Sequence, residues 1–117
     1  MKPSTTLLDK VWRPHVVMEE EGCPAVLYVD LHLIHEVTSP QAFTGLAARG
    51  LSVRRPDRTL ATMDHSTPTR PPQLAMVDAA ASRQLAQLER NCRHHGITVH
   101  VAGSRHNGIV HVMGPEL

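Results

Sequence analysis

The chain combines two patterns of hydrophobic and polar positions. Four short segments rich in apolar residues are predicted to be strands: residues 25–30, 59–63, 97–101 and 108–113, the last as a strand or strand end. The run at residues 25–30 is continuously apolar as far as Asp30, which is typical of a strand buried on both faces of a sheet. Other segments repeat apolar residues at three- and four-residue spacings, as amphipathic helices do. Strands that alternate with helices predict an α/β fold with a mainly parallel sheet.

Three helices are predicted. The first covers residues 7–12 and ends at Pro14, because proline removes a helix hydrogen bond. The second begins with Pro40 in its first turn, where the missing N–H costs nothing, and ends at Gly50. The third covers residues 78–95 and has the clearest apolar stripe.

Three segments are predicted to be loops. Residues 32–36 follow a predicted strand, so we interpret them as a loop rather than a helix. Residues 66–72 contain three prolines and are expected to be extended. Residues 103–107 separate the last two predicted strands.

Composition limits the classes of function. A chain of 117 residues is long enough for one small domain and short for two, and 41% hydrophobic residues suffice for a core. The net charge of +1 and the lack of a basic stripe argue against a nucleic-acid partner. No apolar run approaches the roughly 18 residues of a membrane span. Cys23 and Cys92 form no disulfide framework, so we expect a reducing, cytoplasmic location.

Asp64 and His65 are the first candidate for chemistry. They follow the predicted strand at residues 59–63, and ligands of α/β sheets bind at the carboxyl ends of strands. An imidazole beside a carboxylate holds a proton near neutral pH and passes it on. The alternative from the residues alone is a solvated pair in a loop.

The chain has nine histidines, and two groups of them suggest other sites. His32 and His35 would share one face of a helix and form a zinc site, although no third ligand stands at a diagnostic spacing. His111 lies in an apolar run, the pattern of a hydrogen-bonded core histidine. Motifs for acyl transfer or nucleotide binding are missing from the sequence.

A longer pattern surrounds these residues. Residues 28–43, YVDLHLIHEVTSPQAF, closely resemble the N-terminal signature of the isopropylmalate dehydratase large subunits, a branch of the aconitase family. The resemblance continues through VRRPD at 53–57, LATMDH at 60–65 and GIVHVMGPE at 108–116. It implies a partial three-layer α/β/α aconitase-like domain with a mainly parallel sheet. Residues 1–117 would be the N-terminal portion of that domain, truncated before the cluster-ligand region.

The resemblance also implies an activity. Family members isomerise 2-isopropylmalate to 3-isopropylmalate by dehydration and rehydration in leucine biosynthesis, with a [4Fe-4S] cluster and a small subunit as heterodimer partner. Cys23 and Cys92 match none of the family's cluster ligands, so we expect this chain alone to ligate no metal and to be inactive. The alternative is a non-catalytic binding module, derived from the enzyme, that pairs with other subunit segments.

The same resemblance assigns roles to five residues. Asp64 and His65 match the family's acid pair, and His111 matches an active-site histidine near the cluster. His35 and Glu36 fall where the family contacts its substrate. These expectations raise the three catalytic candidates above what their local patterns indicate.

Overall fold

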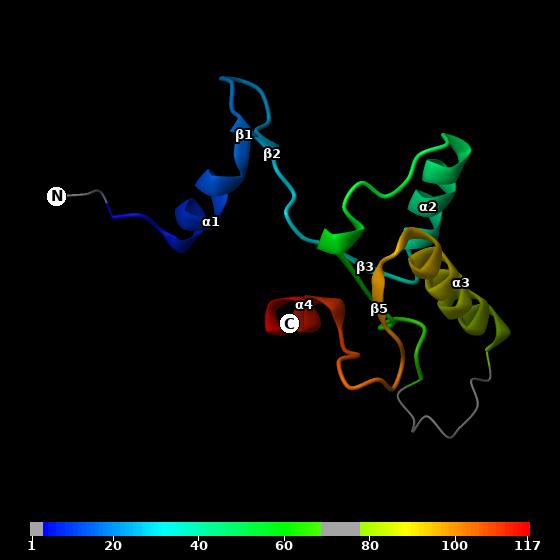
Figure 1. Ribbon diagram of the computed structural model, residues 1–117. Coiled ribbons are helices and arrows are strands. Elements are labelled where there is room, and N and C mark those ends of the chain that lie inside the picture. Colours follow the sequence, from blue (N-terminus) through cyan, green and yellow to red (C-terminus); the bar gives the residue numbers. More distant parts are fainter. Residues whose placement is uncertain (1–3, 69–77) are drawn as a thin grey trace. The chain divides into compact units, whose positions relative to one another are not determined.

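The chain divides into two compact units, Met1–Asp30 and Leu31–Leu117 (Figure 1). The structure is a computed structural model and describes residues 4–68 and 78–117. The predicted extended loop at residues 66–72 therefore lies in part outside the described residues.

The first unit consists of helix α1 (Leu7–His15) followed by a small hairpin of β1 (Val16–Met18) and β2 (Val26–Leu27). Thr6 and Asp9 form a reciprocal cap at the start of α1: the Thr6 hydroxyl accepts the Asp9 N–H at 3.1 Å, and the Asp9 carboxylate accepts the Thr6 N–H at 2.9 Å. The helix runs through Pro14 and ends one residue later than predicted.

The prediction of a buried strand at residues 25–30 is wrong. The strand found there, β2, has two residues, pairs antiparallel with β1, and leaves Val26 and Leu27 exposed. An apolar run indicates burial only when another element covers it, and no neighbour within the first unit covers this one.

The second unit contains a parallel sheet in the order β3–β4–β5, with β3 (His32–His35), β4 (Thr59–Thr62) and β5 (Thr98–His100). The predicted α/β class with a parallel sheet is therefore confirmed. The predicted loop at residues 32–36 is instead the strand β3. This strand lies at the edge of the sheet, where its polar end residues His32 and His35 do not need to be buried.

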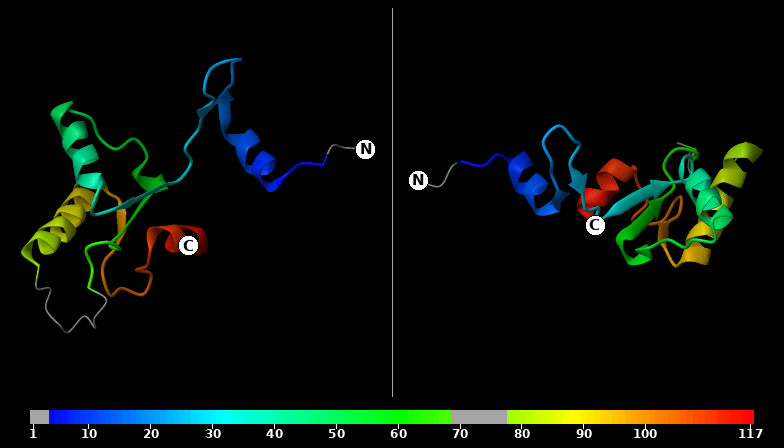
Figure 2. Two further views of the ribbon diagram at one scale, coloured as in Figure 1. Left: turned by 180° about the vertical axis from the view of Figure 1, so that it is seen from behind. Right: turned by 90° about the horizontal axis from the view of Figure 1, so that it is seen from above.

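Helices cover both faces of this sheet (Figures 1 and 2). Helices α2 (Ser39–Ala48) and α3 (Ala79–His95) pack side by side on one face. Their buried residues form one core with alternate residues of the strands: Ile34, Phe43, Ala61, Met63, Leu85, Leu88, Cys92 and Ile97. A short helix, η1 (Pro56–Arg58), leads into β4.

Helix α4 (Val110–Glu116) lies against the other face, where Leu33 of β3 approaches Gly114. The prediction of a strand at residues 108–113 is therefore wrong. The β-branched residues suggested a strand, but only Val110 and Met113 of this helix are buried. Their three-residue spacing is that of one helical face, so packing against the sheet overrides local strand preference.

Two helical glycines give a matched test of this packing. A Cβ at Gly114 would lie 2.3 Å from Leu33 Cδ1, whereas a Cβ at Gly45 of α2 meets nothing within 4 Å. We expect Gly114→Ala to lower the free energy of unfolding by about 1–3 kcal/mol through overpacking. Gly45→Ala should raise it by about 0.5–1 kcal/mol through helix propensity. Denaturant unfolding measures both, and equal effects of the two substitutions would contradict the position of α4.

Candidate active site at the carboxyl end of the sheet

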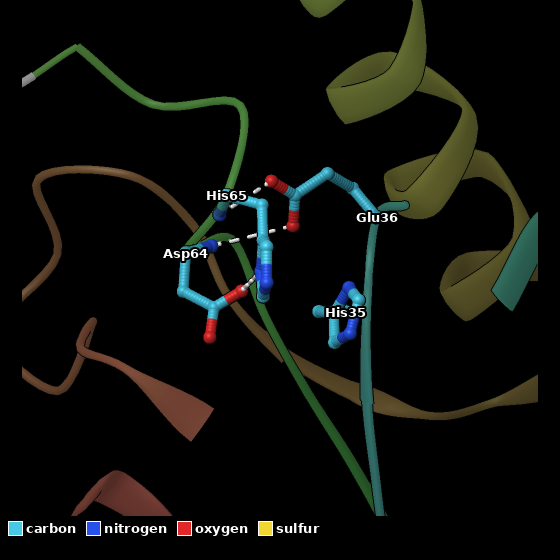
Figure 3. A group of neighbouring side chains, drawn as sticks. All are labelled: His35, Glu36, Asp64 and His65. Carbon is cyan, nitrogen blue, oxygen red and sulfur yellow. Dashed lines mark hydrogen bonds and ion pairs between the residues drawn. The ribbon is translucent and has the colours of Figure 1, made fainter. Parts of the chain in front are cut away.

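Strands β3 and β4 end at the same edge of the sheet, and the side chains that follow them form a cluster (Figure 3). His35 is the last residue of β3 and Glu36 follows it, while Asp64 and His65 come just after β4. These four residues place nitrogen and oxygen atoms within 4.8 Å of one another. The carboxyl edge of a parallel sheet is the usual location of a binding site in α/β folds.

Glu36 lies at the centre of the backbone hydrogen bonding in this cluster. Its side chain is fully buried. One carboxylate oxygen, Oε1, accepts the N–H of His65 at 2.8 Å and also the N–H of Ser66. The other, Oε2, accepts the N–H of Asp64 at 3.3 Å. The carboxylate therefore ties the turn after β4 to the end of β3.

Asp64 is held at both of its carboxylate oxygens. Oδ1 pairs with His65 Nδ1, and Oδ2 accepts the N–H of Val110, at the start of α4, at 2.8 Å. The Asp64 side chain is only 2% exposed, and this burial acts to raise its pKa. The hydrogen bonds from Val110 and His65 outweigh burial, so the pKa of Asp64 falls below its ordinary value.

His65 is the exposed partner of the pair. Half of its side chain, 50%, is open to solvent. The bond to the Asp64 carboxylate raises the pKa of His65, and the charge of Glu36 acts in the same direction. Since Nδ1 is held by Asp64, Nε2 is the nitrogen that remains to exchange a proton with a bound molecule.

His35 stacks on His65, with ring centroids 4.2 Å apart and ring planes 22° from parallel. Its Nδ1 accepts the N–H of Val37 at 3.2 Å, which places the proton of a neutral ring on Nε2. The Ser39 hydroxyl donates to the carbonyl of His35 at 2.6 Å and fixes the backbone below the ring. His35 thus presents an Nε2–H donor beside the imidazole of His65.

The remaining histidine candidates lie elsewhere. His111 is exposed in the first turn of α4, directly after Val110, and is not one of the four clustered residues. His32 and His35 are three residues apart on strand β3, and a strand points such residues to opposite faces. The His32–His35 pair considered for zinc therefore cannot chelate one ion.

Asn107 supports the site, although its sequence pattern gave no reason to single it out. Its side-chain amide donates to the carbonyl of Met63 at 2.8 Å, the carbonyl of His100 at 3.3 Å and the hydroxyl of Thr62 at 3.2 Å. These bonds tie the ends of β4 and β5 to the loop that precedes α4. Its position in a glycine-containing loop is the only local signal for such a role, and that signal is common.

The residues present do not fit a metal cluster. An iron–sulfur cluster requires cysteine thiolates. Cys92 is fully buried in the core, and this burial raises the pKa of its thiol to about 11. Cys23 is exposed in the loop between β1 and β2, in the other unit. The carboxylate oxygens of Glu36 and Asp64 already accept hydrogen bonds within the chain, so these two carboxylates have partners without a cation.

Comparison with known proteins places this arrangement in a family. A profile of the Aconitase family (aconitate hydratase) matches residues 9–117. The chain belongs to the aconitase family. Within this family it is 63% identical, over 116 residues and 95% of its length, to a protein of Roseiflexus castenholzii named 3-isopropylmalate dehydratase large subunit. A protein of the same name from Anaeromyxobacter dehalogenans is 56% identical over 96% of the chain.

This aconitase-family chain spans about a quarter of the length of the curated relatives that it matches, 25% and 24%. No solved structure matches the chain. Among the helices of residues 4–68 and 78–117, none has the length and apolar character needed to cross a membrane. The family profile and the two relatives confirm, at the level of the family, the resemblance seen in the sequence.

The Asp64–His65 pair predicts a shifted titration. We expect His65 to titrate above the ordinary histidine value of about 6.5, and Asp64→Asn to lower its pKa toward that value because the carboxylate is gone. The raised pKa means that the pair stabilises the fold below the ordinary value, and that this contribution is lost as the pH rises through the raised one. Histidine NMR titration measures the shift. Asp57→Asn, at the opposite end of β4, is the control and should leave His65 unchanged.

The two cysteines should differ in reactivity. In the native chain we expect a thiol reagent to modify Cys23 quickly and Cys92 only after denaturant is added, because burial and a pKa of about 11 keep the Cys92 thiol protonated and covered. Cys23→Ser should abolish the fast phase. A fast reaction that survives this substitution would contradict the burial of Cys92.

Proposed function

We propose that this chain supplies the proton-donating pair of an aconitase-family hydro-lyase that isomerises 2-isopropylmalate to 3-isopropylmalate in leucine biosynthesis. The observation that carries the proposal is the Asp64–His65 pair, buried at the carboxylate and exposed at the imidazole. The names of the two relatives support the substrate, since both are called 3-isopropylmalate dehydratase large subunits.

In this proposal His65 is the acid. Its Nε2 donates a proton to the departing hydroxyl of the substrate while a base from outside this chain takes the proton of the neighbouring carbon, so that water leaves and a C=C bond forms. When water adds to that neighbouring carbon, His65 recovers a proton from the water and the base returns its proton to the first carbon. Asp64 remains ionised, holds the ring at Nδ1 and stabilises the imidazolium form. The raised pKa of His65 favours its protonated form, the form in which an imidazole acts as an acid.

His35 and His111 are proposed as the substrate-facing neighbours of this pair. The Nε2–H of His35 lies on a ring stacked against His65 and offers a hydrogen bond to a substrate carboxylate. We propose that His111 faces the substrate from α4, where it follows Val110, the residue whose N–H bonds to Asp64. Both substrates are dicarboxylates, and donors that flank an imidazolium suit a dianion.

The rest of the enzyme would come from outside this chain. We propose that the family's [4Fe-4S] cluster is ligated elsewhere, because Cys23 and Cys92 do not fit it, and that a small subunit completes the site. The isolated chain would then bind partner segments without catalysing the reaction. Because neither cysteine fits a cluster ligand, the two cysteines also support the alternative function, a non-catalytic binding module.

A chimera tests the proposal directly. The matching quarter of the Roseiflexus castenholzii large subunit is replaced by this chain, and conversion of 2-isopropylmalate is assayed with the small subunit present. We expect an active chimera, and a loss of at least about 100-fold in kcat for His65→Gln and for Asp64→Asn, because each removes the positioned acid. His94→Gln, at the end of α3, is the matched control and should keep the activity.

Two results would count against the proposal. Full activity of the His65→Gln chimera would exclude His65 as the acid. Turnover of 2-isopropylmalate by the isolated 117-residue chain would exclude the view that the remaining parts lie elsewhere.

A further inference from the structure

We propose that Glu36 is a positioning residue: its buried carboxylate fixes the turn that carries Asp64 and His65, and so sets the direction of the His65 ring. This inference rests on the proposed role of the pair and deepens it. The sequence led us to expect that Glu36 contacts the substrate; in this proposal it contacts the protein's own backbone instead.

Three backbone donors converge on Glu36. The N–H groups of three successive residues, Asp64, His65 and Ser66, all point to the Glu36 carboxylate. Consecutive N–H groups of this kind form a concave nest that binds an anion. In this chain the anion is a side chain from the neighbouring strand, 28 to 30 residues earlier in the sequence.

Glu36 is inaccessible to a substrate. Glu36 is 0% exposed, and both of its oxygens already accept hydrogen bonds. A substrate carboxylate would also be repelled by it, because like charges at close range destabilise each other. His35 and His65, which are stacked and more exposed, are better placed to meet a dianion (Figure 3).

Loss of the Glu36 carboxylate would destabilise the turn at Asp64. Hydrogen bonds to an ionised acceptor are stronger than neutral ones, and a buried N–H without a partner is expensive. Without Glu36, the turn at Asp64 would leave three N–H groups unsatisfied and would rearrange. The Asp64 carboxylate would move with it and release His65 Nδ1.

Glu36→Gln separates positioning from simple packing, because glutamine has nearly the same size. Its carbonyl oxygen replaces one acceptor, while its NH₂ group would face a backbone donor at the other position. In the 117-residue chain we expect faster amide hydrogen exchange at Asp64, His65 and Ser66, and a His65 pKa closer to the ordinary value. Exchange in the α3 core, at Leu88, should stay slow. Glu20→Gln, in an exposed loop of the first unit, is the matched control and should change none of these.

The same substitution in the chimera gives a second, independent readout. A positioning role predicts that Glu36→Gln lowers kcat by about 10-fold or more while KM stays within about 2-fold, since substrate binding is intact and the acid is misplaced. A large rise in KM with kcat unchanged would instead show a substrate contact and overturn the inference. Unchanged exchange at residues 64–66 in the variant chain would overturn it as well.

The two proposals fail in different ways. If His65→Gln leaves the chimera active, the proposed function is wrong, yet the exchange experiment still shows whether Glu36 holds the turn. If Glu36→Gln unfolds the chain, Glu36→Asp tests the same point. It keeps the charge but is one methylene too short to reach all three donors, so protection at residues 64–66 should fall while the Leu88 amide stays protected.

Discussion

A carboxylate that is removed from water must find hydrogen-bond donors within the protein, and this requirement organises the end of the sheet. Glu36 meets it with backbone N–H groups of the next strand's terminal turn. The arrangement works only because β3 and β4 are parallel and aligned, with His35 opposite Thr62. Parallel pairing therefore decides where Asp64 and His65 stand, and the helices on both faces protect that pairing from water.

Features with local signals were predictable from the sequence. Helix α3 has a carboxylate cap at Asp78 and stops at Gly96, whose φ of 69° suits glycine. The Asp64–His65 pair was expected at the end of a strand, and it lies there because the apolar run before it forms the central strand of the sheet. In each case the residues that decide the outcome are neighbours along the chain.

Features that depend on distant partners were not predictable. The run at residues 25–30 is more apolar than His32–His35, yet it is His32–His35 that forms the strand paired with β4. Helix α4 contains β-branched residues typical of strands, and its form follows from packing on the sheet and from the bond between Val110 and Asp64. The role of Glu36 depends on partners about thirty residues away, so no spacing pattern reveals it.

The double engagement of Asp64 couples two parts of the molecule. One oxygen holds the imidazole of His65 and the other holds the first N–H of α4. Coupling between two equilibria is reciprocal: whatever free energy protonation of His65 adds to the seating of α4, the seating of α4 adds to the binding of that proton. A molecule that pulls α4 away from the sheet would change the affinity of His65 for its proton, and loss of that proton would in turn change how firmly α4 is seated.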